Sequence, residues 1–200
     1  MPGVIIKGNH HQEKSEGFEV SGVSSAARPS RRLRWAVVGA GNAAKVHHLP
    51  VIPKIETIEL VGLCDISLER AQPLGEQYGV PVYSDLASML EKEKPDVLDV
   101  CVGEPWHYEC AMQGVQSGVH VLVEKPITHS VSTARELVDT AEKAGIMLGV
   151  NYNYRYIPAF RILKEHIDGG KLGELAYIHA DAASQCVHHA LDLMQYWGGE

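Results

Sequence analysis

Short apolar runs alternate with amphipathic stretches between residues 35 and 150. The runs have the length and composition of buried strands, and the stretches between them carry apolar residues at helical spacing. The expected strands are 35–38, 58–65, 81–83, 96–102, 119–123 and 146–150. The expected helices include 67–78, 85–92 and 130–144. This alternation predicts an α/β fold with a doubly wound parallel sheet of the Rossmann type.

Glycines interrupt the chain directly after the first expected strand. The segment from Gly39 to Ala44 matches the pattern G-x-G-x-x-G/A of dinucleotide-binding turns. Gly39 can adopt backbone angles closed to other residues, and Gly41 lets the main chain approach a diphosphate. A helix that opens at Asn42 and Ala43 would direct free N–H groups at the phosphates. Taken alone, the motif is equally compatible with a glycine turn in another kind of α/β domain.

A carboxylate ends the second expected strand. Asp65 lies 26 residues after Gly39 (65 − 39), close to the offset of roughly 20 residues at which such an acid contacts ribose hydroxyls. Its charge would repel a ribose 2′-phosphate, which favours NAD as the cofactor, while Arg70 nearby keeps NADP open. The alternative is that Asp65 only caps the helix that starts near Ser67.

Polar residues also follow the later strands, at the sheet edge where ligands bind in this fold. They are the loop with Trp106 and His107, the segment Glu124-Lys125-Pro126, and residues 151–155. Lys125 is the strongest candidate for chemistry, because an oxidised nicotinamide beside it would disfavour its ammonium form and allow proton exchange near neutral pH. The alternative is a surface lysine that pairs with Glu124.

Composition narrows the class of protein. A net charge of −7 argues against a nucleic-acid-binding protein, which needs a basic face. No run of roughly 18 apolar residues is present, so no membrane span is expected. Four cysteines without C-x-x-C spacing suggest reduced thiols in a cytoplasmic protein. Residues 1–32 are rich in Ser, Gly and charged side chains and suggest a flexible leader.

Four segments together resemble the Gfo/Idh/MocA family, which includes glucose-fructose oxidoreductase and inositol dehydrogenase. They are Gly39–Ala44 with His47-His48-Leu49-Pro50, then Cys64-Asp65, then Val121 to Pro126, and then Asn153-Tyr154-Arg155. The resemblance covers about residues 34–180. It implies an NAD(P)-dependent dehydrogenase of sugars, inositols or related polyols. It also implies a dinucleotide-binding domain at 33–150 and a second domain with a large, mostly antiparallel sheet.

The resemblance assigns roles to individual residues. Lys125 would hold the reacting hydroxyl and move its proton while the nicotinamide takes the hydride, and the Lys125–Pro126 bond is expected to be cis. His189 would assist as a proton relay or substrate ligand, although adjacent histidines on a helix are more often surface or packing residues. The remaining assignments are His107, Glu124 and Arg155 at the cofactor, and Asn153 and Asp192 at the substrate. No metal-binding cluster accompanies them.

The C-terminal part departs from the family pattern. About fifty residues follow Val150, enough for a helix at 157–167, a strand at 174–180 and a last helix. Residues 151–200 are therefore expected to be the incomplete start of an α+β domain that binds substrate and forms a homo-oligomer. Gln185 stands where many members carry an aspartate. Three alternatives stay open: a non-catalytic dinucleotide-binding or regulatory protein, an inactive truncated product, and a glycosidase that uses bound NAD transiently.

Overall fold

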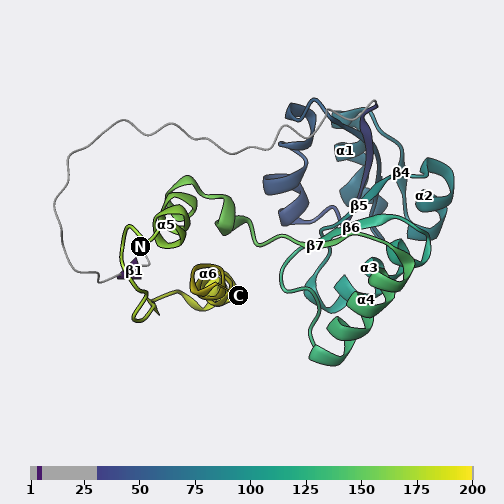
Figure 1. Cartoon of the computed structure of the whole chain (residues 1–200). Helices are drawn as coiled ribbons and strands as arrows, with labels where there is room; N and C mark the ends of the chain where they lie inside the picture. Colours follow the sequence, from purple (N-terminus) through teal and green to yellow (C-terminus); the bar gives the residue numbers. More distant parts are fainter. Residues whose placement is uncertain (1–3, 6–30, 200) are drawn as a thin grey trace. The chain divides into compact units, whose positions relative to one another are not determined.

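The chain divides into two units in the computed structural model, which describes residues 4–5 and 31–199 (Figure 1). One unit comprises residues 25–151, and the other comprises 1–24 and 152–200. The expected leader at 1–32 falls mostly outside the described residues, and within it Val4–Ile5 form strand β1. Among the helices that the structure describes, none has the length and apolar character needed to cross a membrane.

Six parallel strands form the sheet of the first unit, in the order β4-β3-β2-β5-β6-β7. They are β2 (Leu33–Val38), β3 (Ile58–Cys64), β4 (Val82–Tyr83), β5 (Val97–Val100), β6 (His120–Val123) and β7 (Leu148–Val150). The α-helices are α1 (Leu68–Tyr78), α2 (Leu86–Glu93), α3 (His107–Gln116) and α4 (Val131–Ala144). The predicted doubly wound parallel fold is confirmed. The direction of winding reverses between β2 and β5, and ligands bind at such a switch point.

Side chains that alternate along β2 supply the cores on both faces of the sheet. Val37 belongs to an apolar cluster with residues of α1, whereas Ala36 and Val38 belong to a cluster with residues of α2, α3 and α4. Figure 1 shows α1 on one side of the sheet and α3 and α4 together on the other. A strand that is apolar on both faces is what a sheet covered on both sides requires.

Local signals explain where the helices begin and end. Gly79 ends α1 in the left-handed conformation, with φ at +68°. Asp85 caps α2 by accepting the N–H of Ser88 at 2.8 Å, and Ser130 caps α4 by accepting the N–H of Thr133 at 3.2 Å. The observed bounds of these three helices agree with the predicted ones to within one residue.

The helix after the glycine turn is short and wide. It is a π-helical segment, η1 (Ala44–His48), in which the Leu49 N–H donates to the Ala44 carbonyl at 2.9 Å. It ends before Pro50, and a 3-10 turn, η2 (Ile52–Lys54), follows it. Pro50 ends this segment, because proline cannot donate the next backbone hydrogen bond.

Within its described residues, the second unit has two α-helices and one short strand pair. Its elements after residue 151 are η4 (Asn153–Tyr156), α5 (Pro158–Asp168), β8 (His179–Ala180), η5 (Ser184–Cys186) and α6 (Val187–Gly198). The rings of Phe160 and Trp197 meet edge to face at 5.5 Å, and the Trp197 side chain is buried. The Trp197 indole N–H donates to the Phe160 carbonyl at 3.3 Å. These contacts join α5 to α6.

The prediction of a strand at 174–180 is wrong in its extent. Only His179–Ala180 form β8, which pairs antiparallel with Val4–Ile5 of β1. A strand continues only as far as a neighbour satisfies its backbone hydrogen bonds. Among the described residues, only His179 and Ala180 have a partner strand.

Leu137 of α4 tests the packing of the first unit, because its side chain is 0% exposed. We expect Leu137→Ala to lower the free energy of unfolding by about 2–5 kcal/mol, since it leaves a cavity in the larger apolar cluster. Urea unfolding followed by circular dichroism measures the change. The control is Val131→Ala on the same helix, where the side chain is 71% exposed. Equal losses in the two variants would contradict the packing described for α4.

Candidate functional site

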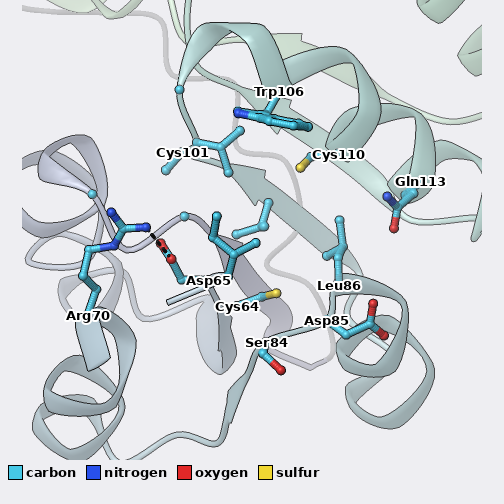
Figure 2. Close-up of a pocket in the computed structure, with 16 residues that line it drawn as sticks. Cys64, Asp65, Arg70, Ser84, Asp85, Leu86, Cys101, Trp106, Cys110 and Gln113 are labelled. Carbon is cyan, nitrogen blue, oxygen red and sulfur yellow. Dashed lines mark hydrogen bonds and ion pairs between the residues drawn. The ribbon is translucent and has the colours of Figure 1, made fainter. Parts of the chain in front are cut away.

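A cavity of about 520 Å³ opens beside the carboxyl ends of β2, β3 and β5. The residues that line it include Gly39 and Gly41 after β2, Asp65 after β3, and Trp106 after β5 (Figure 2). It therefore lies at the switch point of the sheet, where the fold is expected to bind a ligand. Of the cofactor residues expected in the first unit, Asn42, Ala43, His107, Glu124 and Lys125 are outside its lining, and Arg155 belongs to the second unit.

The two glycines of the turn have different surroundings. Gly39 has φ at +99°, and a Cβ placed on it would lie 2.6 Å from the carbonyl carbon of Cys101. This residue therefore has to be glycine for the turn to lie against the strand end. A Cβ placed on Gly41 would meet no atom within 4 Å, so the main chain faces open space in the cavity. An accessible main chain of this kind fits the diphosphate of a dinucleotide.

Asp65 is a buried carboxylate with three donors. Its Oδ2 accepts the N–H of Ala40 at 2.7 Å, and its Oδ1 accepts the N–H of Ser67 and the Arg70 guanidinium at 2.8 and 2.9 Å. Burial by itself raises the pKa of Asp65, but these hydrogen bonds outweigh it and hold the pKa below the usual value. The side chain is therefore ionised at neutral pH. It contacts the start of α1 and also lines the cavity, so both roles considered for it from the sequence remain open.

Apolar side chains are exposed at the rim of the cavity. Ile66 is 87% exposed and Trp106 is 62% exposed, and both line the cavity. Figure 2 shows Trp106 at one edge and the Asp65–Arg70 ion pair at another. Exposed apolar surface in a mostly apolar cavity is typical of a ligand-binding site.

A buried hydrogen-bond network lies beside this cavity, and its centre is His48 of η1. The Nδ1 atom of His48 lies 2.8 Å from Oδ2 of Asp99, and its Nε2 lies 2.9 Å from Oε1 of Glu124. The Asn151 side-chain amide donates to the same Oε1 at 2.6 Å. Trp35 donates its indole N–H to Asp99 at 3.2 Å. The network thus joins η1 to the carboxyl ends of β5, β6 and β7.

The network places the His48 imidazole between two carboxyl groups, those of Asp99 and Glu124. Burial by itself lowers the pKa of His48, but hydrogen bonds with Asp99, Cys101 and Glu124 outweigh it and raise the pKa. Burial likewise raises the pKa of Glu124, yet the bonds with His48 and Asn151 bring it well below the usual value. His48 is therefore an imidazolium, and Glu124 is a carboxylate.

The ligand atoms of His48, Asp99 and Cys101 come within 4.8 Å of one another, which raises the question of a metal site. Two ligand atoms on a tetrahedral zinc ion are roughly 3.3 Å apart. The separation between His48 and Asp99 is 2.8 Å, and Trp35 donates a proton to the same Asp99 oxygen. The arrangement is that of hydrogen bonding.

Lys125 follows β6, and hydrogen bonds fix the backbone at Lys125 and at Pro126. Its N–H donates to Oε2 of Glu124 at 3.3 Å, and the Lys125–Pro126 bond is cis, as predicted. Nδ1 of His107 lies 2.7 Å from the Pro126 carbonyl oxygen, and Nε2 lies 3.1 Å from that of Val102. His107 is 2% exposed, and it contacts the backbone of Pro126, which directly follows Lys125. Within the described residues, no ion pair joins the Lys125 ammonium to Glu124.

The other expected site residues belong to the second unit. Arg155 donates through Nε and Nη2 to both carboxylate oxygens of Asp192, at 2.7 and 2.6 Å. His189 is buried in α6 and stacks on the ring of Tyr154, with 3.9 Å between ring centres. Asn153 is exposed in η4. The structure thus pairs Arg155 of η4 with Asp192 of α6 and places His189 about one turn before Asp192 on α6.

His48, Asp99 and Asn151 of this network had no individual role assigned from the sequence. These residues are far apart in the sequence, and the fold brings Asp99 and Asn151 to His48. One signal was available, because Asp99 is a charged residue inside an otherwise apolar strand. A carboxylate in such a strand requires a buried partner.

Residues 33–152 match the family model described as "Oxidoreductase family, NAD-binding Rossmann fold". The D-glucoside 3-dehydrogenase of Escherichia coli is 37% identical over 162 residues, which are 80% of this chain and 46% of that protein. The D-apiose dehydrogenase of Paraburkholderia graminis is 30% identical over 76% of this chain and 40% of its own length. The chain therefore spans less than half of these relatives.

Solved structures agree with the sequence relatives. The WlbA dehydrogenase of Bordetella pertussis, determined with NADH and UDP-GlcNAcA, superposes with a TM-score of 0.69 at 28% identity. The match covers 72% of this chain and 42% of that one. The shared region thus extends over most of the described chain but under half of the larger structure.

The charge of His48 makes a pH-dependent prediction. We expect the His48 imidazole to stay protonated from about pH 5 to about pH 9 in the folded protein, because Asp99 and Glu124 stabilise its charge. Nitrogen-15 NMR of the imidazole follows the protonation. The control is the urea-unfolded chain, in which histidine titrates near pH 6.5.

The corresponding effect on stability has a definite sign. A raised folded-state pKa stabilises the protein fully below about pH 6.5, and the contribution falls as the pH rises from there toward the folded pKa, by at most about 1.4 kcal/mol per pH unit. An imidazole that loses its proton near pH 6.5 in the folded protein would contradict the assignment.

Proposed function

Because the chain belongs to the Gfo/Idh/MocA family of oxidoreductases, we propose that it binds NAD and takes part in hydride transfer from a secondary alcohol of a sugar or related polyol. The cavity at the switch point carries this proposal, since it combines an open main chain at Gly41 with the ionised carboxylate of Asp65. The names of the relatives support the substrate class, because they include dehydrogenases of D-glucoside and D-apiose. The whole activity is a proposal, because the chain covers under half of each relative.

The residues around the cavity fit NAD by their chemistry. The turn from Gly39 to Ala43 would accept the diphosphate, and Asp65 would accept hydroxyl groups of the adenosine ribose. NAD is preferred over NADP, because the ionised Asp65 would repel a 2′-phosphate and also holds the Arg70 guanidinium. When bound, the nicotinamide supplies the hydride acceptor, which no side chain of the protein can replace.

Lys125 is proposed as the acid/base. It would bind the reacting hydroxyl and accept its proton as the carbon–hydrogen bond breaks, and His107 and Glu124 would hold its backbone in place. In the second unit, His189 is proposed to assist at the substrate, together with Asn153. Arg155 and Asp192 are proposed to act as the ion pair that the structure shows.

The proposal also assigns the parts of the chain. Residues 33–150 form the dinucleotide-binding domain, and 151–200 form the beginning of a domain for substrate binding and self-association. A cytoplasmic location is proposed from the thiols, since all four cysteines are free. The second candidate is a dinucleotide-binding protein without catalysis, which Gln185 favours because an amide cannot act as an acid or base.

NAD binding tests the cavity. We expect Gly41→Ala to weaken NAD binding by about tenfold or more, because a methyl group would occupy the space that the diphosphate needs. Isothermal titration calorimetry measures the dissociation constant, with thermal unfolding as the check on folding. The control is Gly149→Ala in β7, where a Cβ would lie in ordinary contact at 3.5 Å from Leu122. Unchanged NAD binding in Gly41→Ala would place the diphosphate elsewhere.

Turnover tests Lys125. We expect Lys125→Met to reduce the rate of NAD reduction with a panel of sugars and polyols by about 10²–10⁴-fold, since no group is left to take the hydroxyl proton. NAD affinity should change little. The control is Lys143→Met at the exposed end of α4. NAD binding without turnover in the unmodified chain would favour the non-catalytic candidate.

A further inference from the structure

We infer that His48 is a positioning residue, which acts as the counter-ion of Glu124 and keeps that carboxylate from pairing with the ammonium group of Lys125. The inference rests on the proposed function, because it concerns the residue proposed as acid/base. It goes beyond that function by giving a task to the buried network around His48.

The orientation of Glu124 is the first observation. Both donors to its Oε1 come from other segments, His48 Nε2 at 2.9 Å and Asn151 Nδ2 at 2.6 Å. Its Oε2 accepts the backbone N–H of Lys125 at 3.3 Å. The carboxylate is thus occupied by donors other than the Lys125 side chain, although the two residues are adjacent.

The second observation is the charge balance around His48. Asp99 lies on one side of the imidazole and Glu124 on the other, at 2.8 and 2.9 Å. Cys101 and Asn151 complete the polar groups that face the ring, and the Cys101 thiol donates to Asp99 at 3.5 Å. His48 itself is 7% exposed. A cation this well enclosed by carboxylates keeps its charge, and the direction of its pKa agrees.

The consequence for Lys125 follows from electrostatics. A carboxylate beside an ammonium group stabilises the charged form of the amine, and only the neutral amine can accept a proton. Without the imidazolium, Lys125 would be the neighbouring cation for Glu124. His48 compensates the charge of Glu124 from the opposite side. Glu124 therefore stabilises the ammonium form of Lys125 less, and a larger share of the amine is neutral.

The experiment measures how readily the Lys125 amine reacts, because only neutral amines are acetylated. The protein is treated with a trace of acetic anhydride at constant pH, and peptide mass spectrometry compares Lys125 with Lys45, an exposed lysine of η1. We expect His48→Gln to slow acetylation of Lys125 relative to Lys45 by about tenfold. The variant should stabilise the ammonium form, so that a tenfold smaller share of the amine is neutral at the same pH.

Two further variants complete the design. His47→Gln is the matched control, because His47 is the exposed neighbour on the same segment, and it should leave the ratio unchanged. The double variant His48→Gln with Asp99→Asn removes one cation and one anion together, which protects folding if the single variant unfolds. It should slow acetylation as His48→Gln does, since Glu124 again lacks its counter-ion.

An unchanged acetylation ratio in folded His48 variants would overturn the inference. The measurement needs neither NAD nor a substrate, so it remains decisive if the chain proves to have no dehydrogenase activity. Where turnover is measurable, the pH profile of kcat/KM provides a second readout. Its rise should move to higher pH in His48→Gln and stay in place in His47→Gln.

Discussion

The close approach of Gly39 to the end of β5 is the contact on which the first unit depends. A side chain at this position would collide with the backbone of Cys101, and the positive φ would strain any other residue. Because the turn can lie there, Gly41 borders the cavity and η1 follows directly. His48 of η1 can then reach Asp99 of β5. Cofactor site and buried network are therefore set by one local packing constraint.

Three carboxylates of the candidate site each pair with a cationic side chain. Asp65 is met by Arg70, Glu124 by His48, and Asp192 by Arg155. Each acid stands at the end of a strand or on a helix and is bonded by its cation directly. A buried acid without such a partner would lose its charge or destabilise the fold. The sites are consequently preorganised before any ligand arrives.

Sequence patterns with local causes predicted the fold well. Strand and helix alternation depends on neighbouring residues and was confirmed, and the cis bond before Pro126, which the family resemblance implied, is also present. The strand expected at 174–180 is shorter in the structure, where among the described residues only 179–180 pair with a distant segment, β1. The network of His48 was missed for a similar reason, since its members come from four separate segments. The roles of individual site residues stay predictions.

Trp106 gives the protein an internal optical reporter. The chain has three tryptophans, of which Trp197 is 1% exposed, Trp35 is half-buried, and Trp106 is 62% exposed at the rim of the cavity. Water quenches and red-shifts the fluorescence of an exposed indole. A molecule that covers this rim would therefore change the fluorescence of Trp106. Occupancy of the cavity can therefore be followed in the unmodified protein, without any label.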